Sequence, residues 1–314
     1  MSTQDKDRNF EIHPLVIGTR GSPLAVAQAD ETKNRLIKSH GFSEEAIKIK
    51  IIKTTGDIVL DRPLSQIGGK GLFTQEIEES LLSGIIDVAV HSMKDMPTLL
   101  PKGLEISTIL PREDVRDSFV SERFKSINEL PIGCTVGTSS LRRKAQLLSK
   151  RPDLKIVEFR GNVQTRLKKL QDGVAEATFL ACAGLVRLGL NELVNPIEIN
   201  DMLPAVAQGA IGIEQRSDDE IISKILKPIN DEKATTQLIT ERSFLSQLDG
   251  SCRTPIGGYA EILGDQIVFK GEIVRPDGSE IIKDVWKGSV SDAFDIGYNA
   301  GRLLKEKGGA GFFE

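Results

Sequence analysis

The sequence predicts an α/β protein of two similar lobes, followed by a smaller α+β domain. Three observations support this prediction: a βαβ pattern opens the chain, a pattern of the same kind restarts near residue 133, and the last third combines helices with antiparallel strands. At 314 residues the chain is also long for a single hydrophobic core. We expect lobe 1 at residues 14–109 with 206–228, lobe 2 at 110–205 and the third domain at 229–314.

Lobe 1 begins with a strand, a turn and a helix. Leu15 to Ile17 predicts a short buried strand, and Ser22 followed by Pro23 is typical of a helix start, with serine as the N-cap. A second strand is predicted at 47–53, where isoleucines alternate with lysines. This βαβ order implies a parallel sheet.

The remainder of lobe 1 leads to a lysine and an aspartate at the end of a strand. The glycine-rich run at 68–71 predicts a mobile loop, and Thr74 is expected to cap the helix that follows. A strand predicted at 85–90 then leads into Lys94 and Asp95. Because ligands in open α/β sheets bind at the carboxyl ends of the strands, Asp95 is a candidate site residue, although an ordinary strand-end ion pair with Lys94 is an alternative.

Lobe 2 repeats this order. A strand at 133–136, a turn at 137–140 and a helix from about Leu141 echo the opening of the chain. Backbone N–H groups and the helix dipole favour anions at a helix start, so both Gly-Thr turns are candidate anion sites. Arg142 and Arg143 in the first turn of the helix strengthen the second site.

Later segments complete lobe 2 and connect it back to lobe 1. Strands are predicted at 154–159 and 177–181, with a helix between them, and the segment 203–210 is interpreted as the return crossing. Two α/β lobes joined by a crossing hinge would place a cleft between the carboxyl edges of their sheets.

The third domain has a different pattern, and a cysteine loop precedes its sheet. A helix is predicted at 232–248, and strands at 259–263, 266–274 and 281–286 are joined by hairpin turns. The loop after the helix is dense in Gly, Ser and Pro and contains Cys252. Taken alone, the loop is better explained as a turn that happens to contain an inert cysteine.

Composition excludes several classes of protein. Three scattered cysteines and three dispersed histidines support neither a disulfide framework nor a metal site. A polar segment at 1–11 and the absence of a long apolar run predict a cytoplasmic protein without a membrane partner. The net charge of −4 argues against nucleic acid, whereas arginines inside motif-like stretches indicate a local anion site. Any one of these arginines is more simply a solvated surface charge: Arg20, Arg142, Arg143, Arg160, Arg166 and Arg187.

Six motifs, in order along the chain, resemble those of porphobilinogen deaminase, the hydroxymethylbilane synthase of tetrapyrrole biosynthesis. They are the segments 18–25, 69–73, 91–95, 137–143, 160–166 and 250–252. The resemblance extends from about residue 16 to residue 301. It implies two periplasmic-binding-protein-like (type II) α/β lobes and a small α+β domain with a three-stranded antiparallel sheet.

The resemblance also implies the reaction. Cys252 would carry a dipyrromethane cofactor through a thioether bond. Four porphobilinogen molecules would be added head to tail with loss of ammonia, and hydrolysis would release hydroxymethylbilane and leave the cofactor attached. This transferase would act as a cytoplasmic monomer, hand its product to the next tetrapyrrole enzyme, and need neither metal, nucleic acid nor membrane.

The site residues follow from the matched motifs. Asp95 would be catalytic, stabilising a cationic pyrrole and helping proton transfer. Each pyrrole carries an acetate and a propionate, which explains a need for gathered arginines. The residues expected to bind the cofactor are Cys252, Lys94, Asp95, Thr138, Ser139, Arg142, Arg143, Arg166 and Gln208. The residues expected to bind the substrate are Arg20, Ser22, Arg160 and Arg187. The expected lid, which includes the glycine-rich loop, contains Lys70 and Phe73.

Two departures and two rival functions remain. Many relatives have glycine where this chain has Ser251 and Ala207, which leaves the local loop geometry open. A two-lobe solute-binding protein would share the fold, but it needs no Cys252 loop. Binding of single-stranded nucleic acid is disfavoured because only 5% of the residues are aromatic.

Overall fold

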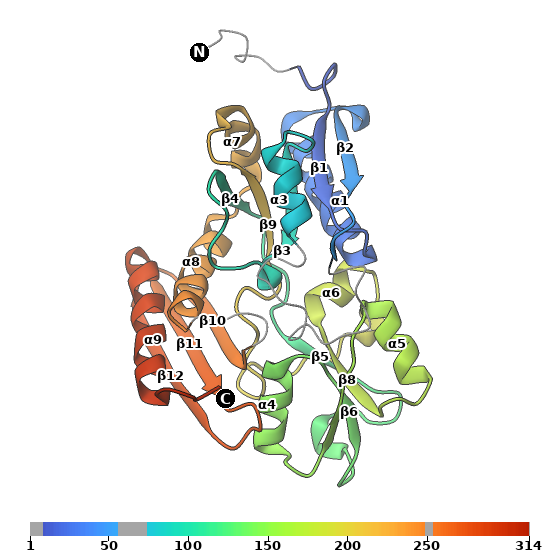
Figure 1. The fold of residues 1–314 in the computed structure, drawn as a ribbon, viewed down its shortest axis with the longest axis vertical. Coiled ribbons are helices and arrows are strands. Elements are labelled where there is room, and N and C mark those ends of the chain that lie inside the picture. Colours follow the sequence, from blue (N-terminus) through green and yellow to red (C-terminus); the bar gives the residue numbers. More distant parts are fainter. Residues whose placement is uncertain (1–8, 56–73, 249–253, 314) are drawn as a thin grey trace. The chain divides into compact units, whose positions relative to one another are not determined.

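The computed structural model describes residues 9–55, 74–248 and 254–313, which belong to two compact units (Figure 1). Unit 1 comprises Met1–Arg112 with Ala210–Thr235, and unit 2 comprises Glu113–Gly209 with Thr236–Glu314. The predicted return crossing therefore ends where the chain re-enters unit 1. Unit 2 holds both the predicted lobe 2 and most of the predicted third domain, so the division into three domains, like the cleft between the lobes, stays a prediction.

Unit 1 is built on a five-stranded sheet with the strand order β2-β1-β3-β9-β4. The strands are β1 (Leu15–Thr19), β2 (Ile47–Ile51), β3 (Val88–Ser92), β4 (Leu104–Ile109) and β9 (Ile211–Arg216). β1 is parallel to β2 and β3, whereas β9 runs antiparallel to β3 and β4. The predicted βαβ unit is confirmed as parallel, whereas β9, which enters from unit 2 rather than through a helical crossover, runs antiparallel to both of its neighbours.

Helices cover both faces of this sheet. They are α1 (Pro23–His40), α3 (Gln75–Leu82) and α7 (Glu220–Leu226). Side chains alternate along a strand, so Leu15 and Ile17 pack with α1 and α7, while Val16 packs with α3 on the other face. The predicted cap of α1 is confirmed, since the Oγ of Ser22 accepts a hydrogen bond from the N–H of Ala25. Thr74 occupies the N-cap position of α3, but its hydroxyl makes no capping bond.

The first part of unit 2 repeats this architecture with the strand order β5-β8-β6-β7. The strands are β5 (Asp117–Val120), β6 (Thr135–Gly137), β7 (Lys155–Val157) and β8 (Ala177–Ala181), and the helices are α4 (Leu141–Lys150), α5 (Val163–Gln171) and α6 (Cys182–Arg187). β6 is parallel to β7 and β8, and β5 is antiparallel to β8. Each strand has a counterpart in unit 1, with β7, β6, β8 and β5 matching β2, β1, β3 and β9. The predicted similarity of the two lobes is confirmed.

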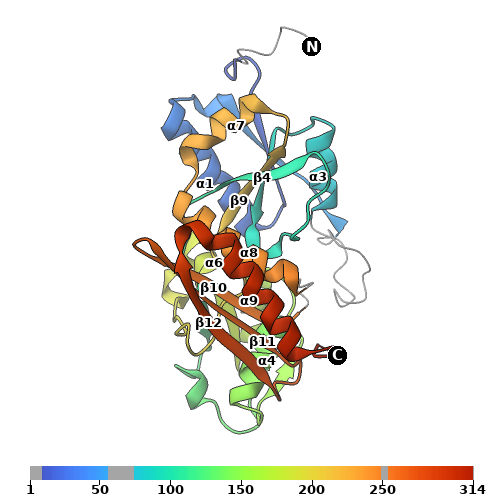
Figure 2. The same ribbon diagram turned by 90° about the vertical axis from the view of Figure 1, so that its left-hand side faces the viewer.

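The last part of unit 2 is the expected α+β arrangement. Its elements are α8 (Glu232–Gln247), which begins at the end of unit 1, and then β10 (Ile256–Leu263), β11 (Gln266–Val274), β12 (Ile281–Ser289) and α9 (Ala293–Gly308). The three strands form an antiparallel sheet, as predicted, and α9 packs along it (Figure 2). Phe244 of α8 and Phe269 of β11 meet edge to face in its core, with ring centroids 4.9 Å apart. No helix among the described residues is long and apolar enough to span a bilayer.

Candidate active site

In unit 1, predicted site residues lie at the carboxyl end of the parallel strands. Arg20 directly follows β1, and Lys94 and Asp95 lie in a short 3-10 helix, Met93–Asp95, that directly follows β3. The N–H of Met93 donates to the carbonyl of Ala210, and the Met93 side chain is buried. Because its first residue is held in this way, the turn presents the exposed Asp95 from a fixed base.

Polar side chains near the end of β3 connect this strand to neighbouring elements. The hydroxyl of Ser92 donates to the amide oxygen of Gln28 on α1, at 3.0 Å, and so ties the end of β3 to the helix. One residue earlier, His91 and Glu214 pair at 2.8 Å across β3 and β9. Among the described residues no group of three His, Cys, Asp or Glu side chains is placed to hold a metal ion.

In unit 2, a buried cluster forms around a carboxylate that our sequence reading did not identify. The cluster, named here the Asp117 cluster, comprises Asp117, Arg142, Arg143 and Gln208, all at most 4% exposed. Arg142 donates from Nη1 to Oδ2 of Asp117 at 2.7 Å, and Arg143 donates from Nε and Nη2 to Oδ1 at 3.1 and 2.7 Å. Gln208 donates from Nε2 to the same Oδ1 at 3.0 Å. For Arg142 and Arg143, the alternative of a solvated surface charge is therefore wrong.

The Asp117 cluster carries an excess positive charge. Burial by itself would raise the pKa of Asp117, but the charges and hydrogen bonds of Arg142 and Arg143 outweigh it and hold this pKa well below its usual range. With one carboxylate against two guanidinium groups, the sum is +1. The Nε of Arg142 is buried and makes no hydrogen bond within the described residues. A buried positive charge with an unused donor fits a ligand that bears carboxylates, such as the dipyrromethane implied by the resemblance.

The turn before α4 uses its hydroxyl groups to hold its own backbone. Thr138 accepts a hydrogen bond from the N–H of Ser140, and Ser139 accepts one from the N–H of Phe159 at 2.9 Å. Ser140 caps α4 by accepting from the N–H of Arg143. These contacts position the start of the arginine-bearing helix, and the predicted cofactor contacts of Thr138 and Ser139 stay predictions.

The other predicted arginines of unit 2 are half-buried and lie on neighbouring elements. Arg160 follows β7, Arg166 lies in α5 and donates to the carbonyl of Gly161, and Arg187 ends α6. Arg187 also donates to the carbonyl of Gly209, the residue after Gln208, at 3.0 Å. The contacts therefore link Arg187 to the Asp117 cluster, whereas Arg160 lies in the adjoining turn between β7 and α5, and Arg166 lies in the first turn of α5.

The cysteines divide into two groups. Cys134 and Cys182 are buried, as predicted, and burial raises the pKa of the Cys134 thiol to about 11 and that of the Cys182 thiol to about 12. Both thiols therefore stay protonated at neutral pH and are poor nucleophiles. Cys252, together with the lid residues Lys70 and Phe73, lies outside the described residues.

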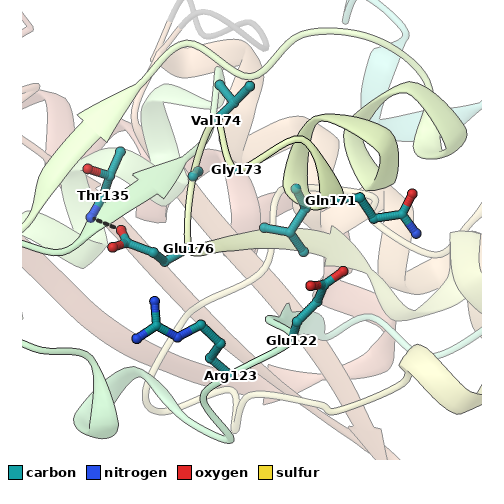
Figure 3. A pocket seen from close by; sticks show the side chains of 9 residues that line it. Glu122, Arg123, Thr135, Gln171, Gly173, Val174 and Glu176 are labelled. Atoms are coloured by element: carbon teal, nitrogen blue, oxygen red, sulfur yellow. Dashed lines mark hydrogen bonds between the residues drawn. The ribbon is translucent and has the colours of Figure 1, made fainter.

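A cavity of about 380 Å³ in unit 2 has none of the predicted site residues in its lining, which Figure 3 shows. Thr135, the first residue of β6, and Glu176, directly before β8, are among its lining residues, and Glu176 accepts a hydrogen bond from the N–H of Thr135. The cavity thus lies at the amino end of these strands, opposite the edge where α/β sheets bind ligands.

Comparisons with known proteins cover nearly the whole chain. The family model described as "Porphobilinogen deaminase, dipyromethane cofactor binding domain" matches residues 15–224, and that of the "Porphobilinogen deaminase, C-terminal domain" matches 235–306. The chain is 57% identical to porphobilinogen deaminase of Paracoccus denitrificans over 303 residues, which cover 96% of this chain and 97% of that protein. It is 53% identical to the chloroplastic porphobilinogen deaminase of Pisum sativum over 304 residues, with 95% and 82% covered.

Comparison with solved structures gives matches of lower similarity. A putative sulfonate-binding protein from Methylobacillus flagellatus matches with 17% identity and a TM-score of 0.36, covering 73% of this chain and 66% of that one. A putative methionine-binding lipoprotein from Bacillus subtilis matches with 14% identity and a TM-score of 0.40, covering 71% and 93%.

Proposed function

This chain belongs to the porphobilinogen deaminase family, and we propose that it condenses four porphobilinogen molecules with loss of ammonia and releases hydroxymethylbilane by hydrolysis. The structural observation that carries the proposal is the Asp117 cluster: a buried excess positive charge with a free Nε donor on Arg142. A growing oligopyrrole accumulates carboxylates, and charge-assisted hydrogen bonds to arginine suit such groups.

The proposed attachment of the cofactor is to Cys252. The other two cysteines of the chain are buried thiols with raised pKa values, so neither is a plausible nucleophile. When bound through Cys252, dipyrromethane would supply the pyrrole carbon to which the first porphobilinogen is joined.

Contacts inside unit 2 connect the strand that follows the cysteine loop in sequence to the arginine-bearing helix. The N–H of Gly258 donates to the carbonyl of Pro204, and Gln146 of α4 donates to the carbonyl of Leu203. β10 therefore begins beside α4, one turn beyond Arg142.

Asp95 is the proposed acid–base group. Its carboxylate is exposed at the carboxyl edge of β3, so it can reach a bound pyrrole, oppose a developing positive charge and exchange a proton. Arg142 and Arg143 would orient carboxylates of the cofactor, while Arg20, Ser22, Arg160 and Arg187 keep their predicted role in substrate binding. Cytoplasmic location, a monomeric state and transfer of the product to the next tetrapyrrole enzyme are further parts of the proposal.

The test is the intact mass of the purified protein. We expect the wild-type chain to carry the added mass of one dipyrrole, and Cys252→Ser to lack it, whereas Cys182→Ala retains it. Brief exposure to porphobilinogen should produce a ladder of heavier species, one pyrrole apart. An unmodified wild-type chain that still releases ammonia and hydroxymethylbilane would refute the covalent cofactor, and binding of porphobilinogen without ammonia release would indicate a solute-binding protein instead.

A further inference from the structure

We propose that Asp117 is a positioning residue, which holds the guanidinium groups of Arg142 and Arg143 and the amide of Gln208 in the geometry that receives the cofactor. The identity of the received group rests on the proposed function above. The geometric part of the proposal is that one carboxylate fixes the positions of three side chains. This part rests on the contacts of unit 2 alone.

The position of Asp117 suits this role. It is the first residue of β5 and pairs with Ala181, the last residue of β8, so its carboxylate lies at the carboxyl edge of the parallel strands. α4 begins at the same edge, directly after the turn that follows β6. The side chain of Asp117 is completely buried, so protein groups rather than water satisfy its oxygens.

Both oxygens of Asp117 accept hydrogen bonds from α4, and one of them also accepts from the return crossing. Oδ2 accepts from Arg142 at 2.7 Å, while Oδ1 accepts from Nη2 of Arg143 at 2.7 Å and from Gln208 at 3.0 Å. Arg142 and Arg143 belong to α4, whereas Gln208 belongs to the segment that leaves unit 2. One carboxylate therefore joins a helix, an edge strand and the return crossing at a single point.

The two arginines differ in how fully they are held. Arg143 uses all three nitrogens, with Nε and Nη2 on Asp117 and Nη1 on the carbonyl of Phe179 at 2.6 Å. Arg142 uses Nη1 for both Asp117 and the carbonyl of Leu203, which leaves its buried Nε without a hydrogen bond among the described residues. We therefore expect Arg143 to complete the support, while Arg142 retains one buried donor for which the described residues supply no acceptor.

The charge of Asp117 is essential to this arrangement. Two buried guanidinium groups on adjacent residues repel each other, and removal of the shared anion leaves buried charges uncompensated. An asparagine keeps the size of the side chain, but its amide nitrogen cannot accept from an arginine. The guanidinium groups of Asp117→Asn would therefore leave their present positions, and the anion site would lose its geometry.

The matched control is Ser118→Ala. Ser118 is the next residue of β5 and is completely buried; its hydroxyl donates to the carbonyl of Leu193 and accepts from the N–H of Asn195, both at 2.8 Å. Neighbouring strand residues point to opposite faces of a sheet, and Ser118 has no contact with the arginines in these bonds. Its loss costs buried hydrogen bonds from the same strand without altering the Asp117 cluster.

The experiment compares wild type, Asp117→Asn and Ser118→Ala by intact mass, by KM and kcat, and by ¹H–¹⁵N spectra of the arginine Nε–H groups. Spectra of Arg142→Lys and Arg143→Lys assign the two signals. We expect Asp117→Asn to lose at least tenfold in the loaded fraction and to shift or broaden both signals. Ser118→Ala should keep the wild-type loaded fraction, KM and both signals, even if its melting temperature falls as far as that of Asp117→Asn.

Each other outcome is decisive as well. Equal loss of loading in Asp117→Asn and Ser118→Ala, or wild-type loading and unshifted signals in Asp117→Asn, would overturn the positioning role. If Asp117→Asn does not fold, Asp117→Glu replaces it: reduced loading with shifted signals supports the role, and wild-type behaviour refutes it. A wild-type protein without any dipyrrole mass would refute the proposed function, while the arginine spectra would still test the geometry.

Discussion

The two α/β lobes share a backbone plan and differ in the charges they place on it. Gly18 in β1 and Gly137 in β6 each pair with the second residue of the neighbouring parallel strand. A serine caps the following helix in both lobes, Ser22 before α1 and Ser140 before α4. The main difference begins in the first helical turn, which has no charged residue in α1 and two arginines in α4.

The carboxyl edges of the two sheets consequently offer different chemistry. The edge in unit 1 presents an exposed acid, Asp95, on a short turn after β3. The edge in unit 2 buries the acid, Asp117, under two arginines and so keeps a net positive charge. In the proposed function, the same frame would serve proton transfer in one copy and anion binding in the other, because only a few side chains at the edge determine its charge.

The largest expected effect is on the exposed acid. Asp95→Asn should lower kcat about 100-fold or more, since acid–base groups contribute at least this much, while the melting temperature and the dipyrrole mass stay unchanged. Glu45→Gln, which alters another exposed carboxylate of unit 1, is the control and should be neutral. If Asp95→Asn loses stability in proportion to activity, Asp95 is a structural ion pair and the contrast between the edges disappears.

Gly18 and Gly137 occupy equivalent positions in the two lobes. Substitution of each tests whether the two lobes tolerate an added methyl group equally. A Cβ on Gly137 would overlap the rigid ring of Phe159, whereas a Cβ on Gly18 would meet the flexible end of the Ile86 side chain. We expect Gly137→Ala to lower the free energy of unfolding by about 2–3 kcal/mol and Gly18→Ala by about 1 kcal/mol. Denaturant titration measures both; a larger loss at Gly18 would show that unit 1 is the less adaptable frame.

A strained residue distinguishes unit 2 from unit 1. Left-handed backbone in the described part of unit 1 occurs at glycines, but in unit 2 Ala207 has a φ of 61°. Its N–H donates to the buried Glu241 at 2.6 Å, and this clamp holds the residue next to Gln208. Ala207→Gly should raise the free energy of unfolding by about 0.5–1 kcal/mol, because relief of left-handed strain exceeds the entropy cost of glycine.

The control for this stabilising change is Ala205→Gly, two residues earlier, where φ is not positive. It should lower stability slightly, because glycine there brings only its entropy cost. Thermal unfolding of both variants separates the effects, and activity should be retained in Ala207→Gly. A destabilised Ala207→Gly would mean that the crossing segment gains nothing from glycine at this position.

The smallest expected effect concerns pH. Burial raises the pKa of Glu272, although Arg142 and two lysines partly oppose it. A carboxyl group with a raised folded pKa stabilises the fold fully below its unfolded pKa and loses that contribution as the pH rises through its folded pKa. Glu272→Gln should therefore match wild type near pH 4 and melt higher at pH 8, by about 2 °C. A gap that narrows with rising pH would contradict this assignment.

Much of the local structure follows from the sequence alone, because its determinants are close together in the chain. Ser22 and Pro23 start α1, Gly41 ends it, and the alternating segments of the third domain form the expected hairpins. The resemblance of the motifs also identified the family. These features depend on neighbouring residues, whose preferences survive without any tertiary contact.

Tertiary structure decided the features that depend on distant partners. β5 and β9 were not predicted, since each is an antiparallel strand whose partner comes from another part of the chain. For the same reason the sequence identified Arg142 and Arg143 but not Asp117, which lies 25 and 26 residues away from them. Residue spacing carries no record of which charges meet across a sheet. The packing of β5 beside α4 buries Arg142 and Arg143 and brings the carboxylate of Asp117 within hydrogen-bond distance of both.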